Sequence, residues 1–99
     1  MKLADLKRLP IGTRLVLVNC LTGACNKGRT IVGMQSNCMI VEPDGKPGTK
    51  SYMPFPKAKE FEPTENGFRI FEEHEVGTQD GPVVRRYLAA EYTFETAAV

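Results

Sequence analysis

The stretch "LVLVNCLTGACNKGRT", from Leu15 to Thr30, decides the fold expected for this chain. It begins as a run of aliphatic and β-branched residues, which is typical of a strand and predicts one over residues 14–20. Residues 21–28 are expected to form a loop, and β-branched side chains then return and predict a second strand over residues 29–35. The stretch therefore predicts two β-strands joined by a polar, exposed loop.

This loop differs by one residue from the phosphate-binding pattern G-x-x-x-x-G-K-[ST], because Arg29 stands where the pattern has lysine. The pattern binds phosphate only where a helix begins directly after it, since the N–H groups at the helix N-terminus hold the phosphate. Here β-branched residues follow and end at a Ser36-Asn37 turn, which leaves no room for a helix. We therefore expect no nucleotide site and no cofactor.

The cysteines raise the question of a metal site. Cys20, Cys25, Cys38 and the single histidine, His74, would supply the ligands of a Cys₃His zinc site. However, Cys38 is expected at the turn after the second strand, ~20 Å from Cys25 at ~3.3 Å per residue, which is too far for one ion. We expect no metal site and three reduced thiols, since an odd cysteine count does not suit a secreted disulfide framework.

The rest of the chain is expected to be mainly β. A short helix is predicted over residues 2–9, where three leucines recur and Pro10 follows. Further strands and turns are indicated by β-branched runs and by Pro, Gly and Asn. We expect strands over 38–42, over 50–56 and over 68–72, the last with residues 73–76 as a candidate extension. In the 50–56 strand Tyr52 is expected to reach the core, with Met53 or Phe55 as further candidates. We also expect turns at 43–48 and 66–67, a loop at 77–82 and an irregular segment over 57–65.

The last part of the chain is ambiguous. Residues 83–94 fit either a strand or a helix, and their β-branched and aromatic content favours the strand. The residues after Glu95 are expected to form a frayed tail. Together with a preceding strand, this segment would make a C-terminal hairpin.

These elements predict a single domain over residues 1–99. We expect a small antiparallel SH3-like barrel with an N-terminal helix over residues 1–72, and a C-terminal hairpin or helix extension over residues 73–99. An OB-like barrel is the alternative. The chain has no apolar run of ~18 residues and has charges near its start, so we expect no membrane span, no signal peptide and a cytoplasmic location.

Charge is distributed unevenly along the chain. Residues 1–59 carry ten Lys or Arg against three acids, a net +7, whereas residues 60–99 carry three against nine, a net −6. Such a division predicts a basic face for an anionic partner, or two halves that neutralise each other in the folded domain. The sequence leaves both interpretations open.

No arrangement of residues in the sequence is typical of an enzyme. We expect instead a surface that binds a macromolecule, with the 23–29 loop and the C-terminal hairpin as contact surfaces and a homodimer through the C-terminal strand as one outcome. A nucleic acid bound by loop cations is the alternative, against which the acidic second half counts. The candidate contact residues are Asn26, Lys27, Arg29, Lys46, Lys50, Lys57, Lys59, Arg85 and Arg86.

Three motifs carry a resemblance to a known group of proteins. They are Leu-Pro-x-Gly-Thr-Arg-Leu, Gly-x-Cys-Asn-Lys-x-Arg-Thr and Gln-Ser-Asn, within about residues 6–72. With them the chain resembles a group of small uncharacterised phage-encoded proteins. The resemblance implies a phage or prophage origin and no assigned activity. It also implies a host protein as the partner, which the chain would inhibit or redirect in the host cytoplasm.

Overall fold

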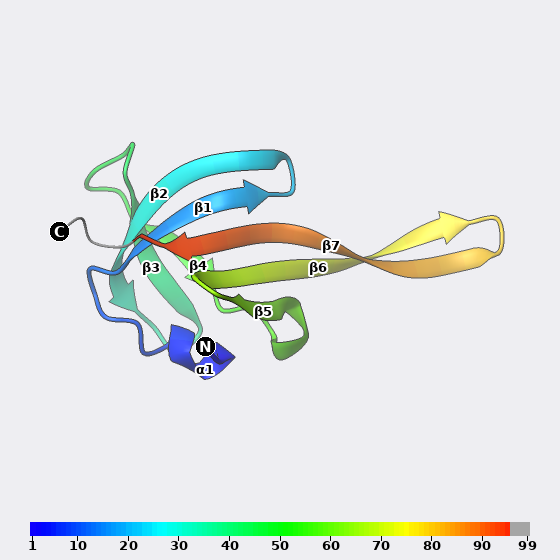
Figure 1. Cartoon of the computed structure of the whole chain (residues 1–99), viewed down its shortest axis with the longest axis horizontal. Helices are drawn as coiled ribbons and strands as arrows, with labels where there is room; N and C mark the ends of the chain where they lie inside the picture. The colour runs from blue at the N-terminus through cyan, green and yellow to red at the C-terminus, as the bar shows by residue number, and fades with distance from the viewer. Residues whose placement is uncertain (96–99) are drawn as a thin grey trace.

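The computed structural model describes residues 1–95, and the frayed tail expected after Glu95 lies outside them. The described chain forms a single antiparallel sheet of seven strands, in the order β4-β3-β2-β1-β7-β6-β5. The elements are α1 (Leu3–Leu6), β1 (Arg14–Cys20), β2 (Gly23–Met34), β3 (Cys38–Pro43), β4 (Ser51–Pro54), the 3₁₀ helix η1 (Ala58–Glu60), β5 (Phe61–Thr64), β6 (Gly67–Thr78) and β7 (Gly81–Phe94). The sheet curls into a half-barrel whose outer strands are β4 and β5 (Figure 1). The prediction of a mainly β fold is confirmed.

One apolar core fills the inside of the half-barrel. Leu6 reaches this core from α1 and is fully buried, while Leu3 and Leu9 pack beside it. A helix of one turn is not stable alone, so α1 depends on this contact. The strands supply the remaining buried side chains, which are Leu15, Ile31, Met39, Val41, Phe68 and Tyr92. The predicted helix is therefore present, although it is shorter than residues 2–9.

The prediction of a loop over residues 21–28 is wrong, because β2 already begins at Gly23. After a tight turn at Leu21 and Thr22, β2 begins at Gly23 and pairs with β1. Leu17 lies opposite Lys27, but Asn19 lies opposite Ala24, so β2 contains an extra residue, a β-bulge. Asn26 lies in this bulge with a φ of 49°, a conformation that asparagine tolerates better than most residues. The polar residues that predicted a loop are thus held in a strand by pairing.

Residues 57–65 are not irregular, because they contain η1 and β5. β5 forms a hairpin with β6 through a two-residue turn, so the turn lies at Glu65-Asn66 and one residue before the predicted position. The strand predicted over 50–56 is present as β4, which spans only Ser51–Pro54. β4 lies at an edge of the sheet, as its proline requires. Tyr52 is 61% exposed, so its placement in the core is wrong, whereas the other two candidates, Met53 and Phe55, pack against the core.

β6 and β7 form the longest hairpin of the molecule. β5 pairs with residues 67–70 of β6, and β1 pairs with residues 90–94 of β7. Residues 71–88, here called the arm, therefore pair only with each other, and they project from the half-barrel (Figure 1). The arm explains why the molecule measures 53 × 27 × 26 Å. The strand alternative for residues 83–94 is confirmed, and the helix alternative is wrong.

The prediction of three reduced thiols is wrong for two of the cysteines. Cys20 and Cys25 form a disulfide, with their Cα atoms 6.2 Å apart. Cys20 ends β1 and Cys25 lies near the start of β2, so the hairpin brings them together. Cys38 is a free, buried thiol. Within residues 1–95, no cluster of three or more His, Cys, Asp or Glu could hold a metal ion.

Candidate functional site

An open hollow of about 780 Å³ lies where β2 faces the connection between β3 and β4. Asn26, Lys27 and Arg29 line it from β2, and Lys46 lines it from the β3–β4 turn. These four residues were predicted as partner contacts, and the fold brings them together from two segments of the chain. Thr49 and Ser51 add hydroxyl groups to the same lining.

Arg29 is the most unusual residue of the hollow. It lies opposite Leu15 in the sheet and two residues before Ile31, so its side chain shares the face of these buried residues. Its Cζ lies 5.4 Å from the centre of the Tyr92 ring, and its Nη1 lies 3.6 Å from the sulfur of Met53. Its Nε is buried and has no hydrogen-bond partner in residues 1–95. Arg29 is therefore a half-buried cation on an aromatic ring, with one donor unused.

The charge of Arg29 affects the pKa of the neighbouring Tyr92. Burial raises the pKa of the Tyr92 phenol above its ordinary value, and the positive charge of Arg29 opposes that rise. The opposition follows because a nearby cation favours the phenolate. The pKa of Tyr92 thus depends on both its burial and the charge of Arg29.

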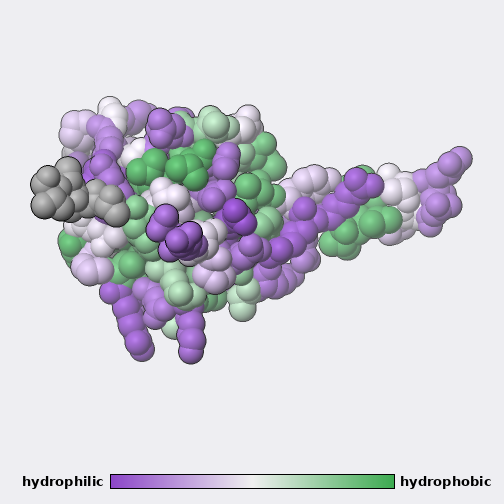
Figure 2. All heavy atoms as spheres, in the orientation of Figure 1, coloured by the Kyte–Doolittle hydropathy of each residue, from purple (hydrophilic) through white to green (hydrophobic). Residues whose placement is uncertain are grey.

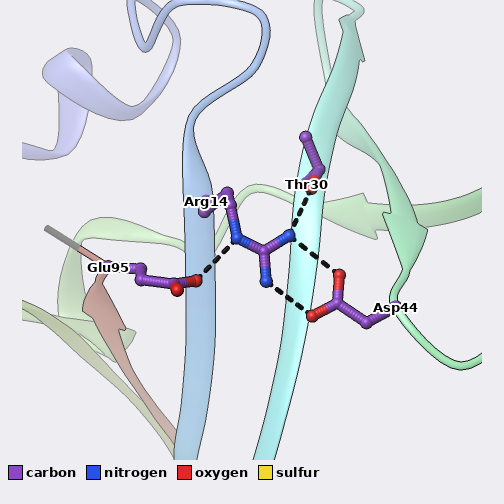
Figure 3. Close-up of polar contacts among 4 residues, drawn as sticks. All are labelled: Arg14, Thr30, Asp44 and Glu95. Atoms are coloured by element: carbon purple, nitrogen blue, oxygen red, sulfur yellow. Dashed lines mark hydrogen bonds and ion pairs between the residues drawn. The ribbon is translucent and has the colours of Figure 1, made fainter. Parts of the chain in front are cut away.

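A second arginine holds the outer side of the hollow together. Arg14 donates to both carboxylate oxygens of Asp44, at 2.9 and 2.6 Å, and its Nε donates to Glu95 at 2.6 Å (Figure 3). It also donates to the hydroxyl of Thr30 at 2.9 Å. Hydrogen bonds to the two carboxylates raise the pKa of Arg14, and those from Arg14 lower the pKa of Asp44. This network ties β1, β2, the β3–β4 turn and the end of β7 to one side chain.

The network needs the glycine at position 28. A Cβ atom there would collide with the Oδ2 atom of Asp44 and would lie 3.0 Å from a guanidinium nitrogen of Arg14. Gly28 therefore leaves room for the ion pair to cross β2. Since Asp44 is held by Arg14, the one acid on the rim of the hollow is already paired.

The other predicted contact residues lie elsewhere. Lys50 stands in the β3–β4 connection, outside the lining of the hollow. Lys57 and Lys59 lie at η1, where the Lys59 ammonium is 3.9 Å from Glu73. On the arm, Arg85 lies opposite His74, and the Arg86 guanidinium lies 3.8 Å from the centre of the Phe71 ring.

The C-terminal hairpin was predicted as a contact surface, but the apolar side chains that the arm exposes were not among the predicted contact residues. Val83, Val84 and Tyr87 are 45%, 63% and 37% exposed, and Figure 2 shows apolar atoms on the arm between hydrophilic ones. Val84 lies on one face of the ribbon, whereas Val83 and Tyr87 lie on the other, because successive residues of a strand alternate. The position of these apolar residues directly beside Arg85 and Arg86 in the sequence was the available signal.

Comparison with protein-family models, with curated proteins and with solved structures gave no match to this chain. Within residues 1–95, no helix has the length and apolar character needed to cross a membrane.

Proposed function

We propose that this chain is a non-enzymatic binding protein that engages a protein partner through the arm. One observation carries the proposal: a two-stranded ribbon projects from the body with Val83, Val84 and Tyr87 exposed. A ribbon of two strands has no core of its own, so its apolar side chains stay in water until another surface covers them. Tyrosine is also enriched in protein interfaces.

The free edges of the arm support the same function. Residues 71–78 and 81–88 pair only with each other, so the outer backbone groups of both strands face no other strand in the described chain. Such edges can accept a strand from a partner, and the neighbouring side chains then give the contact its specificity.

The resemblance to small phage-encoded proteins indicates the kind of partner. We expect a host protein that this chain inhibits or redirects in the host cytoplasm. The half-barrel is then the body that presents the arm. β1, β2, β3 and β4 are sequential neighbours in the sheet, which supports the SH3-like description of this body over the OB-like one.

A photo-crosslinking experiment tests the proposal. A benzophenone amino acid is placed at Val84 in one protein and at Tyr52 in a matched control, since these residues are 63% and 61% exposed on different elements. In the host, we expect a covalent adduct with one protein from position 84 and not from position 52. The purified adduct partner should then bind the unmodified chain, and Val84→Asp should weaken that binding about tenfold or more.

Two results would contradict a host-protein partner. The first is the same set of adducts from both positions. The second is an adduct between two copies of the chain, together with a dimer in solution that Val84→Asp converts to a monomer. In that case the arm is covered by a second copy.

A further inference from the structure

The hollow holds positive charge that its surroundings do not neutralise. Lys27, Arg29 and Lys46 line it, and within residues 1–95 none of the three forms an ion pair. The one acid on the rim, Asp44, gives both its carboxylate oxygens to Arg14. Three cationic residues from two segments therefore line one open space, and the one acid among the lining residues is already paired with Arg14.

Arg29 is held in place by its neighbours and carries one donor without an acceptor. Its Nε is buried without a hydrogen-bond acceptor, which is unusual because buried polar groups in folded proteins are nearly always bonded. The Tyr92 ring and the sulfur of Met53 hold its guanidinium in place. A held guanidinium loses little conformational freedom when it binds an anion, so Arg29 is prepared for one.

The chemistry of the lining points to phosphate. A phosphate monoester carries close to two negative charges near pH 7 and offers three strong acceptor oxygens. The planar guanidinium of Arg29 suits this geometry, the two lysines add point charges, and Asn26 and Ser51 add neutral donors. The volume of about 780 Å³ leaves room for an organic group beside the phosphate.

We infer that the hollow is a binding site for a phosphate group, held by Arg29, Lys27 and Lys46. The group belongs to a small phosphorylated compound or to the backbone of a single-stranded nucleic acid. Side chains of β2 and of the β3–β4 turn hold it, so no helix N-terminus is needed. The site shares no residue with the arm, and its test is independent of the proposed function.

Titration calorimetry with two probes tests the inference. Pyrophosphate represents a small phosphorylated compound, and an oligothymidylate represents a nucleic-acid backbone, both at low ionic strength. Whichever probe binds the parent protein, Arg29→Gln should weaken its binding about tenfold or more, since a charge-assisted hydrogen bond is lost. Lys27→Gln combined with Lys46→Gln should act in the same direction. Both lysines are exposed, so this variant tests the site even if Arg29→Gln does not fold.

Arg8→Gln is the matched control, because it removes one exposed cation near α1 and outside the hollow. Binding of pyrophosphate that the hollow variants weaken and Arg8→Gln does not assigns the site to small compounds. If only the oligonucleotide binds, and the hollow variants weaken its binding while Arg8→Gln does not, the site is assigned to a nucleic acid. Binding of the oligonucleotide should then fall steeply as the salt concentration rises. No binding of either probe up to about 1 mM, or equal weakening by Arg8→Gln, would overturn the inference.

Discussion

At the scale of single residues, two glycines show how space constrains this fold in different ways. Gly67 lies opposite Thr93, and a Cβ there would collide with the carbonyl oxygen of Tyr92 and lie 2.8 Å from the Cα of Thr93. Gly77, in the arm, has no atom within 4 Å of the same position. Neither has a positive φ, so only the available space distinguishes them.

Gly67→Ala should therefore destabilise the protein, because backbone atoms of β7 cannot move aside as a flexible side chain can. We expect a loss of roughly 1–3 kcal/mol in the free energy of unfolding, measured by denaturant titration. Gly77→Ala is the matched control and should change it by less than about 0.5 kcal/mol. Equal effects of the two variants would contradict a close β6–β7 contact at Gly67.

The Arg14–Asp44 ion pair predicts that the stability of the folded protein depends on pH. Arg14 lowers the pKa of Asp44 below its ordinary value of 3.8, mainly through hydrogen bonds. A carboxyl whose pKa is lower in the folded state stabilises the protein above its unfolded pKa, and this contribution is lost as the pH falls through the folded pKa. Asp44→Asn should thus be less stable than the parent at pH 7. The difference should shrink as the pH falls below 3.8 and should vanish below the lower pKa that Asp44 has in the folded protein.

Unfolding by denaturant at a series of pH values measures this difference. Asp80→Asn, at the tip of the arm, is the control, since Asp80 forms no ion pair within residues 1–95. It should follow the parent at every pH. A gap between parent and Asp44→Asn that persists unchanged in acid would indicate that the pair is not the cause.

At the scale of elements, the disulfide joins β1 and β2 beside the turn that connects them. It closes a loop between Cys20 and Cys25, five positions apart. Chain entropy predicts about 2 kcal/mol of stabilisation for so short a loop. We expect a reducing agent to lower the melting temperature of the parent but not that of the Cys20→Ser, Cys25→Ser double variant. Alkylation of the unfolded, unreduced protein should modify Cys38 alone.

The arm should be separable from the body. None of the buried core residues lies within residues 73–86. Replacing that segment by an Asn-Gly turn, which suits a two-residue hairpin, should leave the melting temperature within a few degrees of the parent. Circular dichroism on heating measures it. A large loss of stability would mean that the contact of Arg86 with the Phe71 ring supports the core.

The elements also show which parts of the fold the sequence could predict. The strand over residues 14–20 is confirmed in full, because its apolar and β-branched run is a local signal. The start of β2 and all of β5 could not be predicted locally, since pairing with β1 and β6 holds Gly, Asn and Pro residues in strands. The hollow was predicted only as a group of loop cations that could bind a nucleic acid. The Arg14 network was not predicted at all, because it joins residues 81 positions apart.

At the scale of the whole molecule, few ion pairs join the two charged halves. Arg14–Glu95 and Lys59–Glu73 are the ion pairs that join them within residues 1–95. The β3–β4 connection, with Lys46, lies at the opposite end of the molecule from the tip of the arm (Figure 1). The arm itself carries four acids against two arginines. The molecule is thus basic at the hollow and acidic along the arm.

The outer strands of the half-barrel have a consequence for the behaviour of many copies in solution. β4 contains Pro54 and β5 contains Pro63, so each outer edge lacks one N–H donor. Phe55 donates toward β3, to Asn37 at 3.1 Å, so the nitrogen of Pro54 faces away from the sheet. An open sheet with unbroken edges could pair with the edge strands of other copies, one after another, and form fibres. The two prolines therefore oppose such growth at the two outer edges of the half-barrel.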